Sequence, residues 1–425
     1  MFFIAATEPL GDEDQNKSWR KCGFLLGGSE GGSQQRPKSI DYYNILWAEV
    51  SEDGSNLRID FAAQPHPHSL VASSVEYAIQ KDATSADSDA DLKPWIERLL
   101  SRAYGPATRR KRAWVLVNPH AGPGGADKIW EKQVRPIFEA ARMPLTVIRT
   151  TYSGEAVGLA RDLNVDDFDI AVPCSGDGLP HEVFNGLGQR SDARRALSKL
   201  AVCHVPCGSG NAMSCNLYGT HRPSLAALAI VKGVPTSLDL VSVTQGDKRV
   251  LSFLSQAVGQ MAELDILTEH LRWMGAARFT YGFIKLAFQR KVYPCDIAVK
   301  VEIEHKTGIK EHYRRKVEKS STDLLVDAGG SDATAQETTT ATTAPYRDDN
   351  EIRGAEEANS SSISSLDSSD DGPGLPPLKY GTIQDKLPEG WELVPHEKLG
   401  SFYCGNVRSP SPLFPTSGLI PLTTH

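Results

Sequence analysis

The sequence predicts an α/β protein of two domains, with a parallel sheet first and a mainly antiparallel region after it. Strand and helix patterns alternate between residues 113 and 232, which is typical of a parallel sheet covered by helices on both faces. Glycine-rich segments follow several of these strands, where open α/β sheets collect their ligands. From residue 237 on, short apolar strands dominate, which indicates the antiparallel region.

The chain before the parallel sheet divides into two parts. Residues 1–40 are polar and rich in Gly and Ser, so we expect them to be disordered. Residues 41–105 form a small β-rich region, in which an Asp53-Gly54 turn joins two strands and a helix follows. The expected elements are strands at 45–50 and 57–61 and a helix at 95–104.

The α/β domain itself is expected over residues 113–235. Its strands are expected in short apolar runs at 114–117, 145–149, 170–172 and 201–205. Its helices are expected between and after them, at 127–141, 154–163 and 181–187.

The second domain is expected over residues 236–318 and 386–425, divided by an insertion. The insertion, residues 319–385, is poor in aromatic residues and rich in Ser, Thr, Ala and Asp, so we expect it to be disordered. Strands are expected at 238–241, 250–253, 296–301, 391–394 and 401–404, and helices at 261–271 and 276–288.

The bulk properties exclude some classes of protein. A net charge of −7 over 425 residues argues against a nucleic-acid binder. The seven scattered cysteines form no metal-ligand pairs, and we expect reduced thiols in a cytoplasmic protein. No apolar stretch approaches the roughly 18 residues of a membrane-spanning helix. The basic cluster at residues 109–112 is expected to be a solvated linker or, alternatively, a weak contact for a membrane surface.

Three glycine-rich loops follow strands of the α/β domain, at residues 118–125, 175–178 and 206–211. Glycine lets backbone N–H groups approach an oxyanion, and the third loop runs into a helix whose N-terminal dipole favours negative charge. All three loops lie at one edge of the expected sheet, so they can converge on one polyphosphate. The P-loop signature and the dinucleotide-binding glycine pattern are both absent from the sequence.

Asp177 is the main candidate for a catalytic residue in these loops, because its carboxylate lies between two glycines and a substrate can approach it from either side. Phosphoryl transfer to an alcohol requires a proton acceptor near the hydroxyl group, and positioning supplies most of the remaining catalysis. An ordinary Asp-Gly turn is the alternative for this tripeptide taken alone. The two flanking loops favour the catalytic interpretation.

Three motifs together resemble the diacylglycerol kinase catalytic domain family. They are Val-Leu-Val-Asn-Pro at 115–119, Ser-Gly-Asp-Gly-Leu-Pro-His-Glu-Val-Phe-Asn-Gly at 175–186, and Pro-Cys-Gly-Ser-Gly-Asn at 206–211. The Ser that opens the second motif resembles the sphingosine kinase branch of this family. The resemblance implies a lipid kinase whose ATP lies between a parallel-sheet nucleotide-binding domain and an antiparallel β-sandwich domain that binds the lipid.

The resemblance also implies roles for individual residues, with Asp177 as the general base that takes the proton of the lipid hydroxyl. Nucleotide contacts are implied for Asn118, Pro119, His120, Thr150, Ser175, Gly176, Gly178, Glu182, Gly208, Ser209, Gly210, Arg272 and Arg278. Contacts with the lipid are implied for Ser175, Asp177, Ser255 and Asp265. Among these, Asp265 is expected to bind the lipid amine.

ATP and Mg²⁺ are the implied cofactors, because charge on the transferred phosphoryl group must be neutralised. The implied partners are a sphingoid base and a peripheral membrane surface, with no nucleic acid, and the oligomeric state stays open. The sequence indicates no set of protein metal ligands.

Several alternatives stay open at this stage. Asp265 could be a solvated carboxylate near a helix start, and Arg272 and Arg278 could be surface ion-pair partners. The acceptor could be diacylglycerol or ceramide, although a neutral headgroup offers no amine to Asp265. The sequence ends without the late Asp-Gly segment of the family, so we expect an incomplete β-sandwich and consider a catalytically silent lipid- or nucleotide-binding protein.

Overall fold

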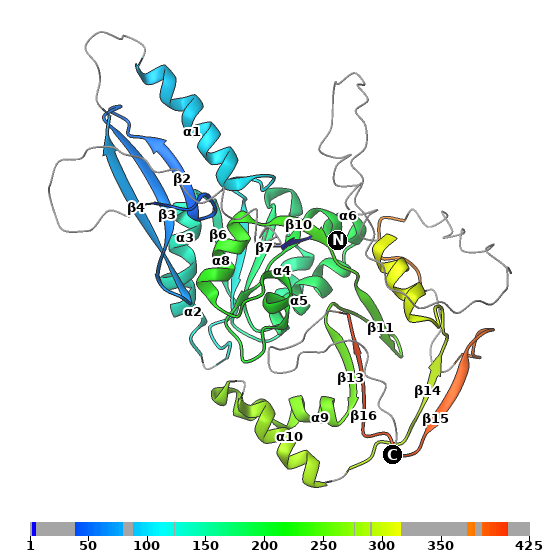
Figure 1. Ribbon diagram of the computed structural model, residues 1–425. Coiled ribbons are helices and arrows are strands. Elements are labelled where there is room, and N and C mark those ends of the chain that lie inside the picture. Colours follow the sequence, from blue (N-terminus) through cyan, green and yellow to red (C-terminus); the bar gives the residue numbers. More distant parts are fainter. Residues whose placement is uncertain are drawn as a thin grey trace, which may run out of the picture.

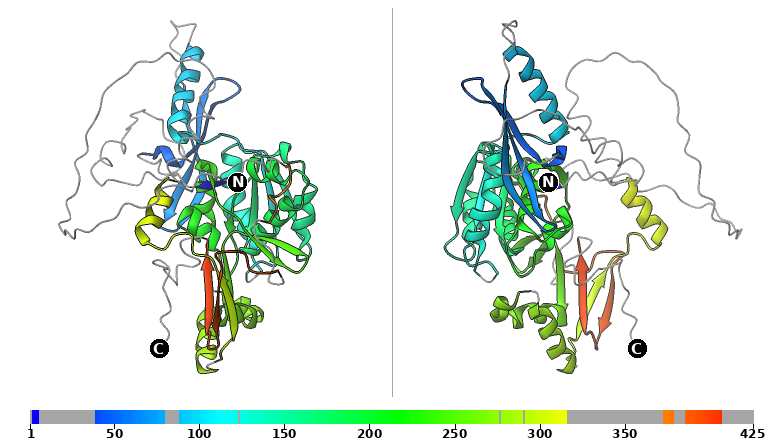
Figure 2. Two further views of the ribbon diagram at one scale, coloured as in Figure 1. Left: turned by 90° about the vertical axis from the view of Figure 1, so that its right-hand side faces the viewer. Right: turned by 60° about the vertical axis from the view of Figure 1, so that its left-hand side comes forward.

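The computed structural model describes residues 2–5, 39–79, 88–122, 124–275, 277–289, 291–315, 372–378 and 385–406. In these stretches, a parallel sheet surrounded by helices lies between a three-stranded sheet and a group of two-stranded antiparallel ladders (Figure 1). Figure 2 shows the three-stranded sheet and the ladders on opposite sides of the parallel-sheet domain. The mixed α/β fold expected from the sequence is therefore confirmed.

The parallel sheet has the strand order β6-β5-β7-β8, and β9 also pairs with β7. Its strands are β5 (Ala113–Val117), β6 (Leu145–Arg149), β7 (Ile170–Ser175), β8 (Ala201–Val202) and β9 (Val205–Pro206). All residues of β5 and β7 are buried, as expected for central strands covered on both faces. The strand expected at 201–205 is interrupted at residues 203 and 204.

Helices cover both faces of this sheet. They are α2 (Ala126–Ile129), α3 (Arg135–Ala140), α4 (Glu155–Arg161), α5 (Gly178–Gly188), α6 (Ala193–Lys199), α7 (Ala212–Tyr218) and α8 (Pro223–Lys232). The single helix expected at 127–141 is instead divided by a π-helical turn, Trp130–Val134. Pro136 in the first turn of α3 has no N–H to continue the α-helical ladder, which is consistent with the division at this point.

The hydrophobic core has two parts, one on each face of the sheet. Val115 and Val117 of β5 join a cluster that includes Trp130. Trp114 and Leu116 of the same strand join the second cluster. This division follows from the alternation of side chains along a strand.

The three-stranded sheet packs beside this domain. It contains β2 (Ile45–Val50), β3 (Asn56–His66) and β4 (Ser69–Ala78), and α1 (Ser88–Tyr104) follows. The two expected strands and their turn are confirmed, with φ of 66° at Gly54, whereas β4 was not expected from the sequence. The sheet packs against α3 and α8.

The expectation of a solvated linker or membrane contact at 109–112 is wrong for Lys111, which is 3% exposed. Its Nζ donates to the backbone oxygens of Ile230 at 3.2 Å and Val231 at 2.7 Å, at the end of α8. Arg112 forms an ion pair with Asp169. Lys111 therefore supplies hydrogen-bond donors to the end of α8, where buried carbonyl groups need them. Arg112 joins the start of β5 to Asp169.

The second region contains β10 (Val234–Ser237), β11 (Val241–Gln245), β12 (Lys248–Ser252), β13 (Ser255–Gly259), β14 (Cys295–Val299), β15 (Glu392–His396) and β16 (Ser401–Gly405). Its helices are α9 (Gln260–Leu267) and α10 (Ala277–Gln289), with a 3-10 segment, Glu269–Met274, between them. The expected strand at 238–241 lies mostly between β10 and β11.

The strands of this region pair antiparallel, as expected. Among the described residues, they form separate two-stranded ladders, β11-β12, β13-β16 and β14-β15, and not one sandwich. The antiparallel pairing is thus observed, and the β-sandwich itself stays a prediction.

Two short segments differ from the expectation of disorder. The apolar residues Phe2–Ala5 form β1, which pairs antiparallel with β10, although they lie within the segment 1–40. Within the segment 319–385, Leu375 packs against the second core cluster, and Pro373 O accepts from the Arg194 N–H at 3.1 Å. Apolar burial explains the position of Leu375. The rest of these two expected segments lies largely outside the described residues, and the domain boundaries remain predictions.

In the part of the chain that the structure describes, no helix is long and apolar enough to span a membrane. The described cysteines form no disulfides among themselves and have free thiols. Cys22 lies outside the described residues.

Candidate active site

Three glycine-rich loops come together at the carboxyl edge of the parallel sheet, after β5, β7 and β9. Gly208 packs so closely on Gly176 that a Cβ atom at position 208 would overlap the Gly176 backbone. Gly122 has a φ of +58°, and a Cβ there would lie 2.7 Å from the Cys207 backbone oxygen. Side chains at these contacts would push the loops apart, which explains the glycines. The loops therefore lie together, as the sequence predicted.

Asp177 lies at the centre of these loops, immediately before α5. Its Oδ2 accepts a hydrogen bond from the Ala212 N–H and its Oδ1 from the Met213 N–H, both at 2.9 Å. A Cβ atom on Gly210 would lie 3.6 Å from Oδ2, so the third loop borders the carboxylate. The N-terminal dipole of α7 favours the charged carboxylate. The side chain is 22% exposed, so it remains accessible to a ligand.

At the start of α7, the Ala212 and Met213 N–H groups donate to Asp177 and are therefore already engaged. The third loop is also closed on itself. The Gly208 N–H donates to Asn211 Oδ1 at 2.9 Å, and Asn211 Nδ2 donates to Gly208 O at 2.8 Å. The Gly208 N–H is thus hydrogen-bonded within its own loop. The absence of a side chain at Gly208 allows the third loop to pack against the second.

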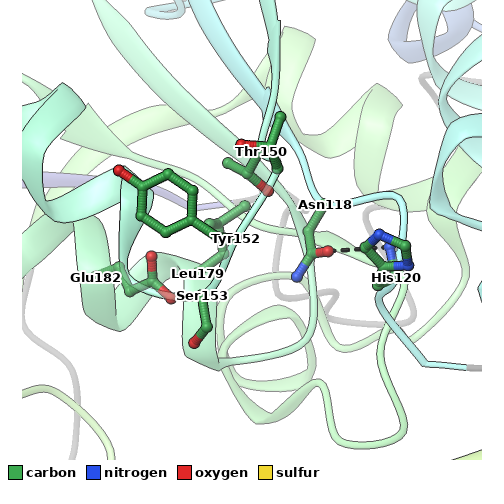
Figure 3. Close-up of a pocket in the computed structure, with 8 residues that line it drawn as sticks. Asn118, His120, Thr150, Tyr152, Ser153, Leu179 and Glu182 are labelled. Carbon is green, nitrogen blue, oxygen red and sulfur yellow. Dashed lines mark hydrogen bonds between the residues drawn. The ribbon is translucent and has the colours of Figure 1, made fainter.

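A cavity of about 170 Å³ lies beside these loops, at the ends of β5 and β6 and the first turns of α5 (Figure 3). It is lined by Asn118, His120, Thr150, Thr151, Tyr152, Ser153, Leu179 and Glu182. The predicted nucleotide residues Asn118, His120, Thr150 and Glu182 therefore share one cavity. Residues 151–153 and Leu179 were missed. Residues 151–153 could have been predicted from their position, because they follow β6 and Thr150 at the edge of the sheet where ligands bind.

The polar side chains of this cavity are held by backbone groups. Asn118 Oδ1 accepts from the His120 N–H at 3.0 Å, which fixes the turn after β5. Glu182 Oε2 accepts from the Ala156 N–H at 3.2 Å, at the start of α4. Thr150 is buried, and its N–H donates to Val117 O at 2.9 Å. The orientations of Asn118 and Glu182 in the cavity are therefore set by the fold.

Other predicted residues lie in the same loops without lining the cavity. Ser175 is buried at the end of β7, and its Oγ donates to Gly176 O at 2.6 Å. Gly178 begins α5 and is exposed, and Pro119 is half-buried in the first loop. Ser209 is half-buried between Gly208 and Gly210.

The predicted residues of the second region lie on other elements. Ser255 begins β13 and faces Gly405 of β16 in the ladder. Asp265 on α9 and Arg278 on α10 form an ion pair with each other, with Oδ1 and Nη2 2.6 Å apart. Arg278 is thus an ion-pair partner, as the alternative expected, although its side chain is only 8% exposed, and its contact with phosphate stays a prediction. The side chain of Arg272 lies outside what the structure describes.

Asn185, which was not among the predicted site residues, joins α5 to the second region. Its Oδ1 accepts from the Leu251 N–H at 2.9 Å, and its Nδ2 donates to Leu251 O at 2.9 Å. Nδ2 also donates to His181 O at 2.8 Å. The amide thus pairs with β12 as a neighbouring strand would, because it offers one donor and one acceptor to one residue's backbone.

No group of three or more His, Cys, Asp or Glu side chains that could hold a metal ion occurs in the described stretches. Mg²⁺ in phosphoryl-transfer sites is commonly held by one or two carboxylates together with substrate phosphates.

Comparison with protein families finds two matching domains. Residues 112–243 match the diacylglycerol kinase catalytic domain, and residues 9–105 match a domain of unknown function (DUF7493). The first match contains all three glycine-rich loops and every residue that lines the cavity.

Curated relatives give the more particular likeness. The chain is 38% identical to "Sphingoid long chain base kinase 5" of Saccharomyces cerevisiae, over 62% of this chain and 39% of that protein. It is 38% identical to "Sphingoid long chain base kinase 4" of Schizosaccharomyces pombe, over 65% and 57%. It is 36% identical to "Sphingosine kinase 1" of Arabidopsis thaliana, over 48% and 43%. The alignments thus span about 40% to 60% of these relatives.

A diacylglycerol kinase of known structure from Bacillus anthracis str. Sterne aligns with 45% of this chain and 60% of its own, at 21% identity. The TM-score of this alignment is 0.34. The family match and the curated relatives confirm the resemblance to the sphingosine kinase branch of the diacylglycerol kinase family.

Proposed function

We propose that this protein transfers the γ-phosphate of ATP to the primary hydroxyl group of a sphingoid long-chain base. The single observation that supports the proposal most is the position of Asp177, which borders the third glycine loop and remains accessible. The likeness to sphingoid long chain base kinases supports the choice of acceptor.

Asp177 is the general base in this proposal. Two backbone N–H groups donate to its carboxylate and hold both oxygens in place for the arriving alcohol. The acceptor hydroxyl donates its proton to the carboxylate as its oxygen attacks phosphorus. The loops at Gly176 and Gly208 fix where this happens, because their backbones are in direct contact.

The cavity beside the loops is the proposed site of the nucleotide. Its lining of amide, hydroxyl, imidazole and carboxylate groups suits the base and ribose of ATP, and the adjoining glycine loops leave room for phosphates. Magnesium, when bound with the nucleotide, would neutralise phosphate charge and would be held largely by the phosphate oxygens.

The second region is proposed to bind the lipid. Asp265 is the proposed partner of the lipid amine, because its side chain is 68% exposed while Arg278 holds it from the buried side. The large apolar side chains of Trp273, Phe283 and Phe288 are exposed on or near α10, which supports a peripheral contact with a membrane surface. A cytoplasmic location is part of this proposal.

Transfer of radiolabel from ATP to lipid tests the proposal, with a sphingoid base, diacylglycerol and ceramide as acceptors. We expect the sphingoid base to be preferred and Asp177→Asn to lower kcat by at least about 100-fold. Asp167→Asn, which alters an exposed carboxylate outside the loops, is the matched control. Equal transfer by Asp177→Asn would exclude the proposed base, and a preference for a neutral lipid would exclude the proposed acceptor.

A further inference from the structure

His204 is completely buried beneath the second glycine loop, in the break between β8 and β9. Its backbone N–H donates to Tyr218 Oη at 3.2 Å, which holds the segment against α7. Its ring Nε2 lies 3.0 Å from the Ser175 backbone oxygen. The imidazole therefore sits directly behind the residues that lead to Asp177.

The contact with Ser175 assigns the tautomer of this ring. A carbonyl oxygen only accepts hydrogen bonds, so Nε2 carries a hydrogen. In the neutral ring, Nδ1 then has a lone pair and no hydrogen. Nδ1 is buried and has no hydrogen-bond partner among the residues that the structure describes, and it lies 3.9 Å from Asp177 Oδ1.

Asp177 is the charged side chain that interacts electrostatically with the His204 ring. Tyr218 and Cys215 on α7 and Cys203 beside it are the other titratable groups nearby. Burial raises the pKa of Tyr218 and Cys215, so both stay neutral near pH 7. Burial also lowers the pKa of His204, with Asp177 opposing the effect, which favours the neutral ring.

A buried polar atom without a partner costs about 1–3 kcal/mol, so its presence next to Asp177 requires an explanation. A lone pair facing an ionised carboxylate cannot form a hydrogen bond. A protonated carboxyl group, in contrast, has an O–H to donate. The Nδ1 acceptor of His204 is therefore matched to the state of Asp177 that exists only after the carboxylate has taken a proton.

We propose that His204 is a positioning residue that receives the Asp177 O–H during phosphoryl transfer, an inference that rests on the proposed kinase function. The O–H bond of the acceptor alcohol breaks while its oxygen bonds to the γ-phosphorus and ADP leaves. The proton moves to Asp177 Oδ1, which then donates to His204 Nδ1. The separation of 3.9 Å must shorten by about 1 Å to reach hydrogen-bond distance, within reach of a small side-chain rotation.

The variant His204→Gln tests this role. A glutamine amide can still donate to Ser175 O, but its acceptor oxygen is not held in a ring at the position of Nδ1. We expect its melting temperature and its KM for ATP to match those of the natural protein, with kcat lowered at least about 10-fold. A kcat within twofold of the natural protein across pH 6 to 9 would overturn the proposal.

A second measurement does not depend on activity or on the folding of that variant. We expect nitrogen-15 NMR of the histidine-labelled full chain to show His204 Nε2 protonated and Nδ1 unprotonated. The Nδ1 signal should also shift when Asp177→Ala removes the carboxylate 3.9 Å away. A protonated Nδ1, or a Nδ1 signal unchanged in Asp177→Ala, would overturn the contact.

The two measurements also separate this inference from the kinase proposal. If the natural chain transfers no phosphate to any lipid while the NMR shift appears, the kinase proposal fails and the Asp177–His204 contact stands. If transfer proceeds and both His204 tests are negative, only the role of His204 is wrong.

Discussion

The carboxylate Oδ1 of Asp265 on α9 lies 2.6 Å from the guanidinium Nη2 of Arg278 on α10. The guanidinium is 8% exposed, and its Nη1 also donates to Thr268 Oγ1 at 3.1 Å. The ring of Phe279 lies under it, 4.1 Å from Cζ. Asp265 therefore neutralises a buried arginine on one side and faces solvent on the other. A cationic ligand that reaches Asp265 must share this carboxylate with Arg278.

Replacement of Asp265 by Ala should affect an amino lipid more than a neutral one. We expect kcat/KM for a sphingoid base to fall at least about 10-fold, while that for ceramide changes little, because only the first offers an ammonium group. Asp265→Ala also leaves the buried Arg278 guanidinium without its carboxylate, so the variant should be less stable, which thermal unfolding measures. Parallel kinase assays with Asp247→Ala, an exposed acid, provide the control. An equal fall for both lipids would contradict amine recognition.

Replacement of Gly208 by Ala should separate the second and third loops. The added methyl group would overlap the backbone of Gly176, which cannot rotate away. We expect a loss of about 1–3 kcal/mol in the free energy of unfolding and weaker ATP binding. Gly158→Ala on α4 is the matched control, because its Cβ would meet nothing within 4 Å and alanine is the better helix former. Calorimetric binding of ATP that is unchanged in Gly208→Ala would contradict this account of the loops.

Replacement of Asn185 by Leu should loosen the joint between α5 and β12. The Leu251 N–H and C=O would lose their partner, at a cost of about 1–3 kcal/mol locally. We expect faster hydrogen exchange at the Leu251 N–H and slower phosphate transfer, with ATP affinity retained because the cavity is untouched. Asn164→Ala, which removes the cap of a short helix elsewhere, serves for comparison. Exchange at Leu251 that stays as slow as in the natural chain would show that the side chain does not hold the joint.

Lys232 should make stability depend on pH. Its Nζ donates to the Ile45 and Ala103 backbone oxygens and lies over the Tyr104 ring, and burial lowers its pKa from 10.5 to about 6. Between about pH 6 and pH 10 the unfolded chain holds a proton that the folded chain lacks, so unfolding takes up a proton. The contribution of Lys232 to the free energy of unfolding therefore rises with pH, by at most about 1.4 kcal/mol per pH unit.

Denaturant titrations of the natural chain and of Lys232→Met at several pH values check this sign. We expect the natural chain to gain stability relative to Lys232→Met as the pH rises from 7 to 9. Burial also lowers the pKa of Lys111, to about 8, so Lys111 adds the same trend in both proteins above that pH. Lys128→Met, at an exposed position, should show no such difference. A flat difference for Lys232→Met would mean that the buried amine stays protonated.

The elements that local sequence patterns specify were predicted closely. The apolar runs of β5, β6 and β7 and the glycines after them follow from the period of a strand and from the steric needs of a tight loop. The convergence of the loops followed as well, because parallel strands end at the same edge of a sheet. The roles of the individual residues remain predictions.

The elements that were missed depend on contacts between distant parts of the chain. β4 is rich in small and polar residues, and its pairing with β3 decides its conformation. The short Phe2–Ala5 strand and the packing of Leu375 likewise need partners that are far away in sequence.

The sequence by itself determined the parallel-sheet domain, its three glycine loops and the identity of Asp177 as the residue to examine, since each is written in neighbouring residues. Only the tertiary structure decided that Lys111 is buried, that Asp265 holds Arg278, that Asn185 pairs with Leu251 and that His204 lies behind Asp177. The physical reason is that charge pairing and burial depend on which groups the folded chain brings within a few ångströms, and local periodicity carries no information about that distance.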